Sequence, residues 1–150
     1  MTSKATVKDF LDQRTLAVVG VSRDGKKFGN TAYKELKGKG YRVIPVNPHA
    51  EVIEGDFCYP SLSALPDPVD GVLIVVPPSE TEKVVREAAE AGITRVWMQQ
   101  GAESVAAVRF CEEQGISAVH GECILMFAET GGFHHRLHRW VWGLMGRLPQ

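Results

Sequence analysis

The order of apolar and amphipathic segments constrains the fold of this chain more than any other feature. Short apolar runs, rich in β-branched residues, alternate with longer segments in which apolar residues recur at helical spacing. Apolar runs without polar alternation are typical of strands buried on both faces of a sheet. We expect such strands within residues 16–21, 41–48, 71–78, 94–101 and 116–124. Because helices separate them, the sequence predicts a Rossmann-like, doubly wound α/β fold with a mainly parallel sheet of about five strands.

The helices expected between these strands carry signals at their ends. The expected helical segments are 7–12, 30–40, 79–92 and 102–115. In the third of them, Ser79 and Glu82 have the spacing of a capping box, and Gly92 is placed to end the helix. Pro45 falls inside the second strand, where it has no N–H to donate, so we expect incomplete pairing or an edge position there.

The last segment differs from the rest of the chain. Residues 131–150 carry an apolar stripe at helical spacing, which predicts an amphipathic helix added to a Rossmann-like domain of residues 1–130. This extension could pack on the domain, join two copies into a homodimer or lie on a membrane surface. His134 and His138 lie one turn apart on it, but no third ligand has a fixed spacing, so no metal site is predicted.

Composition excludes several classes of function. The chain has 150 residues and a formal net charge of -1, so no overall basic field would attract nucleic acid. Its charged N-terminus lacks the apolar run of a signal peptide, and no segment predicts a membrane span. The three cysteines, Cys58, Cys111 and Cys123, are odd in number and widely spaced, which favours reduced thiols. We therefore expect a cytoplasmic protein without a nucleic-acid partner.

The expected ligand site lies beyond the carboxyl ends of the parallel strands. Residues 20–30 join the first strand to the next helix, where backbone N–H groups and the positive end of a helix dipole favour phosphate. The glycines permit a tight turn and the close approach of a ligand, while the polar side chains add donors and positive charge. These residues are Gly20, Gly25 and Gly29, then Ser22 and Asn30, and the cations Arg23, Lys26 and Lys27. The segment predicts a site for a di- or polyphosphate.

Motif spacing narrows the choice of phosphate ligand. No window supplies G-x-x-x-x-G-K-[ST], so ATP bound in a P-loop is excluded. An NAD site would have an acid at the end of the second strand to bond the ribose diol. Asn47, Pro48 and His49 stand there instead. A neutral or cationic group at this place suits a phosphorylated ribose, which leaves NADP and coenzyme A as candidates.

Four stretches, in this order and with short spacings, resemble a known family. They are AVVGVSRDGKKFGN, GYRVIPVNP, GVLIVVPPSE and VWMQQG. Together they resemble the small stand-alone coenzyme A-binding proteins, a family similar to the N-terminal domain of the succinyl-CoA synthetase α subunit. The resemblance covers residues 11–129 and leaves the C-terminal extension out.

The resemblance implies a set of contacts with coenzyme A (CoA). The loop after the first strand would hold the phosphates and part of the adenosine, through Gly20, Val21, Ser22, Arg23, Asp24, Gly25, Lys26, Phe28 and Asn30. The group placed beside the adenine ribose would be Asn47, Pro48 and His49. The apolar wall, which offers no proline N–H, would be Val76, Pro77 and Pro78. Near the pantetheine arm would lie Gln100 and Gly101, and the side chains of Gln99 and Gln100 can bond amides.

Two positions depart from the family pattern. Gly121-Glu122-Cys123 stands where the family carries an acidic-basic pair before the cysteine, and His49 stands where a lysine is common. A cysteine near a histidine can form a nucleophilic pair, as Cys123 and His120 could. We expect Cys123 to be a small residue buried at a strand end, and not a nucleophile, because free cysteines are mostly buried.

These residues favour a binding protein over an enzyme. The chain shows no catalytic constellation and has no room for the phosphorylatable histidine and nucleotide-grasp module of an acyl-CoA ligase. The leading expectation is non-catalytic binding of CoA or a short acyl-CoA at the strand-end crevice. Two alternatives stay open: an NADP-linked reductase or CoA-using transferase, and a CoA-binding subunit of an acyl-CoA ligase assembled with a separate nucleotide-grasp partner.

Overall fold

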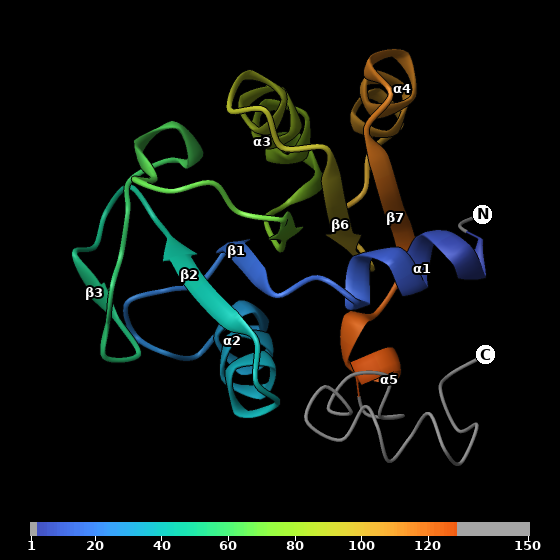
Figure 1. The fold of residues 1–150 in the computed structure, drawn as a ribbon. Coiled ribbons are helices and arrows are strands. Elements are labelled where there is room, and N and C mark those ends of the chain that lie inside the picture. Colours follow the sequence, from blue (N-terminus) through green and yellow to red (C-terminus); the bar gives the residue numbers. More distant parts are fainter. Residues whose placement is uncertain (1–2, 129–150) are drawn as a thin grey trace, which may run out of the picture.

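A computed structural model describes residues 3–128 of the chain (Figure 1). The main elements in chain order are α1 (Lys4–Leu11), β1 (Thr15–Val19), α2 (Phe28–Gly38), β2 (Arg42–Val46), β5 (Gly71–Ile74), α3 (Pro78–Glu90), β6 (Arg95–Gln99), α4 (Val105–Gln114), β7 (Ser117–Glu122) and α5 (Ile124–Ala128). Between β2 and β5 lie the short strands β3 (Val52–Ile53) and β4 (Asp56–Phe57) and the 3-10 turn η1 (Leu62–Ala64). The predicted C-terminal extension, residues 131–150, lies outside the described residues, so its helix and its role in a homodimer stay predictions.

The sheet confirms the predicted fold class. Its five strands are all parallel and lie in the order β2-β1-β5-β6-β7. The chain thus places β2 on one side of β1 and β5 on the other. In an open α/β sheet a ligand binds where the strand order reverses in this way, beyond the carboxyl ends of the strands. That point lies between β1 and β5.

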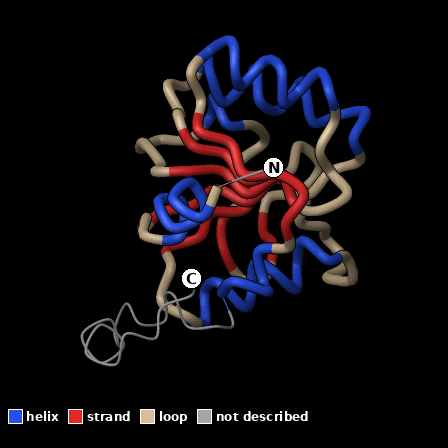
Figure 2. Tube along the Cα trace, turned by 90° about the vertical axis from the view of Figure 1, so that its right-hand side faces the viewer, coloured by secondary structure: helices blue, strands red, loops and turns tan. Residues whose placement is uncertain are grey.

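Helices cover both faces of the sheet, as Figure 2 shows. Because successive side chains along a strand point to opposite faces, Leu16 and Val18 of β1 pack with residues of α1, α2 and α5, while Ala17 packs with residues of α3 and α4. The largest fully buried side chain is that of Trp97, whose ring lies edge-on to Phe10 at a centroid distance of 5.4 Å. Burial on both faces explains why the strands read as continuous apolar runs.

Strand β2 lies at the edge of this sheet, as Pro45 predicted. Pro45 pairs with Val18 of β1, and its own carbonyl accepts a hydrogen bond of 3.1 Å from the N–H of Tyr59. The carbonyl of Val43 accepts from the buried hydroxyl of Tyr33. The open side of β2 is therefore partly occupied by the chain itself.

The predicted capping box of α3 is wrong. The helix begins at Pro78, with Pro77 in the N-cap position and no side-chain cap. A proline fits the first helical position because the N–H it lacks would have no partner there. Ser79 is consequently the second helical residue, and Glu82 pairs with Arg86 at 2.8 Å. The predicted stop is confirmed, since Gly92 has a φ of 78° directly after the cap residue Ala91.

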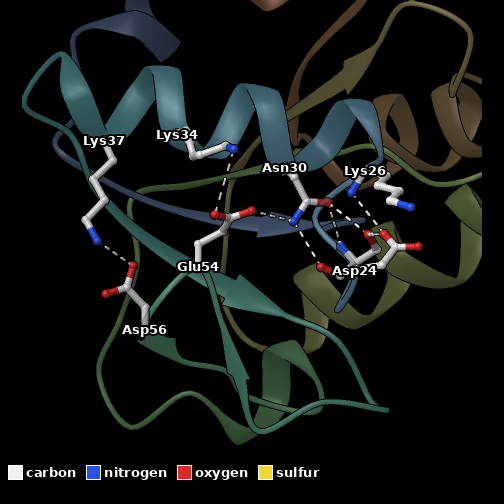
Figure 3. Close-up of polar contacts among 8 residues, drawn as sticks. Asp24, Lys26, Asn30, Lys34, Lys37, Glu54 and Asp56 are labelled. Atoms are coloured by element: carbon white, nitrogen blue, oxygen red, sulfur yellow. Dashed lines mark hydrogen bonds and ion pairs between the residues drawn. The ribbon is translucent and has the colours of Figure 1, made fainter.

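A short hairpin after β2 was not predicted from the sequence. Strands β3 and β4 pair antiparallel, and the turn between them is Glu54-Gly55, with φ values of 53° and 81°. Two positive φ angles in a two-residue turn match the twist of a hairpin. Two acids fix this hairpin to α2: Glu54 contacts Asn30 and Lys34, and Asp56 contacts Lys37 (Figure 3). Asp56 also accepts a hydrogen bond from the hydroxyl of Tyr33.

Candidate functional site

Gly20 directly follows β1, at the point where the strand order reverses. Its φ is +123°, and a Cβ built on it would lie 2.1 Å from the carbonyl oxygen of Val75, just after β5. A Cβ on Gly29, in the first turn of α2, would lie 2.3 Å from the carbonyl oxygen of Gly20. The ends of β1 and β5 and the start of α2 therefore meet at backbone contact. Gly29, expected to let a ligand approach, serves this packing instead.

Asn30 organises the loop between β1 and α2. Its side chain is fully buried, and its Oδ1 accepts from the Ser22 N–H at 2.9 Å and lies 3.0 Å from the Ser22 hydroxyl oxygen. Its Nδ2 donates to the Ser22 carbonyl and to Glu54 Oε2, both at 2.9 Å (Figure 3). The expectation that Asn30 offers a free donor is therefore wrong, because both amide hydrogens are engaged within the protein.

Asp24 shapes the exposed tip of the same loop. Its Oδ1 accepts from the Lys26 N–H at 2.9 Å and from the Ser22 hydroxyl at 2.7 Å. These two hydrogen bonds, the one from Lys26 first, hold the pKa of Asp24 below its usual range, so the carboxylate is charged at neutral pH. Gly25 follows with a φ of +75° and donates to the Ser22 carbonyl at 3.4 Å. Asp24 and Gly25 thus fix the turn that presents the basic side chains.

The surface of this loop favours an anion. The side chains of Arg23, Lys26, Lys27 and Phe28 are exposed. Lys27 occupies the N-cap position of α2 and provides no side-chain cap, although its carbonyl accepts from the Asn30 N–H at 3.0 Å. The first N–H groups of this helix therefore have no side-chain partner at the N-cap. Uncapped N–H groups and the positive end of the helix dipole attract negative charge.

Asn47 joins the loop after β2 to the loop after β1. Its Nδ2 donates to the Val21 carbonyl at 2.9 Å, and its Oδ1 accepts from the His49 N–H at 2.7 Å. The amide nitrogen thus joins the two loops, and the amide oxygen fixes the turn of its own loop. Pro48 and His49 are exposed beside them, at the place expected for the adenine ribose.

The residues after β5 give the site a wall without donors. Val76 is half-buried, and Pro77 and Pro78 are exposed at the start of α3. Since neither proline carries an N–H, this wall leaves no donor unsatisfied beside an apolar ligand group. It lies next to the Gly20 turn, because the Val75 N–H donates to the Val19 carbonyl at 2.7 Å.

The carboxyl ends of β6 and β7 lie next to each other. Gln99 is buried, and its Oε1 accepts from the Ile124 N–H at 3.0 Å, so the side chain expected to bond ligand amides helps to fix the start of α5. Gln100 is exposed and donates its N–H to the Glu122 carbonyl. Gly101 turns with a φ of 94°. Cys123 is half-buried and follows β7 directly.

The expected site residues thus lie mostly in the loops at the carboxyl ends of the parallel strands. A cavity of about 340 Å³ lies elsewhere, against the side of β2, where Lys37, Arg42 and Phe57 are among its lining residues, and it shares none of the expected site residues. No helix in the described part of the chain is long and apolar enough to cross a membrane.

Fold and site define a class: a doubly wound α/β domain with a glycine-containing, basic loop at its topological switch point. We call this loop, residues 20–30, the anion loop, after the charge that its surface favours. The sequence model of a family described as a CoA binding domain matches residues 14–129. The chain therefore belongs to this family of CoA-binding domains, and the resemblance found in the sequence is confirmed.

Known relatives include parts of ligases and small proteins. The α subunit of the ADP-forming acetate–CoA ligase II of Pyrococcus furiosus is 38% identical over 88 residues, which are 58% of this chain and 19% of the subunit. The uncharacterized protein YneT of Bacillus subtilis is 29% identical over 81% of this chain and 91% of its own length. A solved structure of a conserved hypothetical protein from P. furiosus is 44% identical with a TM-score of 0.72, covering 75% of this chain and 97% of that one. The chain thus spans about a fifth of the ligase subunit.

Proposed function

We propose that this protein binds CoA or a short acyl-CoA, without catalysis, across the carboxyl ends of its strands. The observation that carries the proposal is the anion loop, which the Gly20–Gly29 contact fixes at the switch point and whose α2 N-terminus is open. Membership in the CoA-binding domain family supports it.

The chemistry of CoA matches the sequence of surfaces along this edge. The pyrophosphate needs cations and N–H donors, which Arg23, Lys26 and the start of α2 supply. The pantetheine arm combines apolar groups with two amides, and the Val76–Pro78 wall is followed by the exposed amide of Gln100. When bound, CoA would supply a thiol that carries acyl groups.

The second candidate is a CoA-binding subunit of an acyl-CoA ligase. The relative from P. furiosus is a ligase subunit, and the match covers 19% of it. In this second function, a separate nucleotide-grasp chain would complete the ligase. Copurification of the full chain with a nucleotide-grasp protein would favour this second function over binding alone.

Calorimetric titration of the full chain with CoA, dephospho-CoA, NADP and NAD tests the leading proposal. We expect CoA to bind more tightly than either dinucleotide. We also expect a loss of affinity on removal of the 3′-phosphate, because the exposed groups beside the ribose site include His49 and no acid at that strand end. Tighter binding of NADP than of CoA would overturn the proposal in favour of an NADP-linked reductase.

A matched pair of variants tests the placement of the phosphates. Lys26→Gln removes a cation from the anion loop. Lys4→Gln is the control, because it removes an exposed lysine from α1, which precedes β1 and carries none of the expected site residues. One exposed ion pair contributes up to about 1 kcal/mol, so Lys26→Gln should weaken CoA binding about two- to fivefold and reduce its salt dependence. Equal affinities of the two variants would contradict this placement.

A further inference from the structure

Glu54 occupies an unfavourable backbone position at the tip of the β3–β4 hairpin. It is the one non-glycine residue among residues 3–128 with a positive φ, 53°. A side chain in the left-handed region costs free energy unless its surroundings compensate. The Glu54 side chain is only 18% exposed although it lies on a hairpin turn, which shows that it packs inward.

The carboxylate of Glu54 faces α2 and the anion loop. Its Oε2 accepts from Asn30 Nδ2 at 2.9 Å, and its Oε1 lies 3.9 Å from Lys34 Nζ (Figure 3). A Cβ built on Gly25 would lie 3.6 Å from the same Oε2, so the tip of the loop lies directly beside the carboxylate. Glu54 thus contacts Asn30, the residue that organises the loop, and lies close to the loop tip at Gly25.

A carboxylate at this place determines the orientation of the Asn30 amide. An ionised carboxylate only accepts hydrogen bonds, so it holds the Nδ2 group toward itself. The Oδ1 atom then faces Ser22, where it accepts a hydrogen bond from the N–H. If the amide turned over, its oxygen would face the carboxylate and its nitrogen would face the Ser22 N–H, and both contacts would be repulsive.

We propose that Glu54 is a positioning residue for the anion loop. It acts on Ser22 through the side chain of Asn30. The consequence for ligand binding rests on the proposed CoA function, whereas the effect on Ser22 does not. The hairpin does not depend on Glu54 alone, because Asp56 also joins it to α2 through Lys37 and Tyr33. Loss of the Glu54 contact should therefore disturb the loop more than the hairpin.

Two variants of Glu54 separate its reach from its charge. Glu54→Asp keeps the charge and tolerates a positive φ, but it is one methylene too short to reach Asn30 as Glu54 does. Glu54→Gln loses the charge but keeps the length and an oxygen that accepts from Nδ2. Glu51→Asp is the control, because Glu51 is an exposed acid of the same segment.

Hydrogen exchange of the Ser22 amide in the ligand-free protein measures the positioning effect directly. One neutral hydrogen bond corresponds to about a fivefold change in an opening equilibrium, so Ser22 should exchange about five times faster in Glu54→Asp. In Glu54→Gln and Glu51→Asp we expect the Ser22 amide to exchange within about twofold of its rate in the original protein. Glu54→Gln keeps an acceptor for Asn30, and Glu51 does not bond Asn30 in the original protein.

Titration with CoA at low and high salt measures the effect on the site. Glu54→Asp should weaken binding at both salt concentrations, because position is not screened by ions whereas charge is. Unchanged Ser22 exchange in Glu54→Asp would overturn the proposal and leave Glu54 as a hairpin contact only. If the original protein binds no CoA, the proposed function fails, and Ser22 exchange still decides whether Glu54 positions the loop.

Discussion

Replacing Gly29 with alanine tests whether the anion loop depends on backbone contact between α2 and β1. The added Cβ would lie 2.3 Å from the Gly20 carbonyl oxygen, whereas real Cβ atoms stay at least 3.0 Å from other heavy atoms, so α2 or the Gly20 turn must move by 0.7 Å or more. Overpacking of this kind costs about 1–3 kcal/mol, and a contact with backbone belongs at the upper end of that range. The better helix propensity of alanine offsets about 1 kcal/mol of this cost.

The net loss of unfolding free energy expected for Gly29→Ala is about 2 kcal/mol, which for a chain of this size lowers Tm by about 4–8 °C. Gly38→Ala is the matched control, because Gly38 belongs to the same helix and a Cβ there meets nothing within 4 Å. Differential scanning calorimetry of the original protein and both variants gives the comparison, and calorimetric titration shows whether CoA affinity falls with the displaced helix start.

The reasoning fails if Gly29→Ala is as stable as Gly38→Ala. That result would mean that the start of α2 can move away from β1 at no cost in stability, contrary to the energetic estimate. A stable Gly29→Ala that loses CoA affinity would instead support the geometry of the loop while contradicting the energetic estimate.

Two further predictions concern titrating groups, namely the partly exposed carboxylate of Asp56 and the buried thiols of Cys58 and Cys111. Burial alone would raise the pKa of Asp56, but hydrogen bonds from Lys37 and Tyr33 hold that pKa below its usual value. The stability that the carboxylate contributes is therefore present above its usual pKa of about 4 and is lost as the pH falls through the lower folded pKa. In urea unfolding, Asp56→Asn should be less stable than the original protein at pH 6, and the difference should shrink as the pH falls through the folded pKa of Asp56. Burial raises the pKa of the Cys111 thiol to about 11 and that of Cys58 in the same direction, so neither should react with a thiolate-specific reagent at pH 8 in the folded protein, and rapid reaction of either would contradict its burial.

The fold was predictable because the apolar runs record burial on both faces of the sheet. Leu16, Ala17 and Val18 are all fully buried, since helices cover β1 from both sides. Pro45 likewise predicted an edge strand, because a proline has no N–H to donate to a neighbouring strand. Features of this kind can be predicted from consecutive residues alone, because they do not depend on contacts with residues far away in the sequence.

The site was less predictable because its hydrogen bonds join residues far apart in the chain. Asn30 reads as a free donor, and only the structure shows that Glu54, 24 residues later, takes one of its hydrogens. Gln99 similarly pairs with the N–H of Ile124, 25 residues later. The hairpin that carries Glu54 was not predicted because its strands have two residues each, too few to show an alternation of polar and apolar residues. The Glu-Gly pair at its turn was the one signal in the sequence.

The occupied edge of β2 restricts how this protein can assemble with others. A strand added there would need the carbonyls that face outward, yet those of Val43 and Pro45 already accept from Tyr33 and Tyr59, and Pro45 has no N–H to offer. Growth of the sheet through β2 is therefore blocked, and the same arrangement protects the chain against edge-to-edge aggregation. A second copy or a ligase subunit would have to bind through helices, through loops or through β7 at the opposite edge.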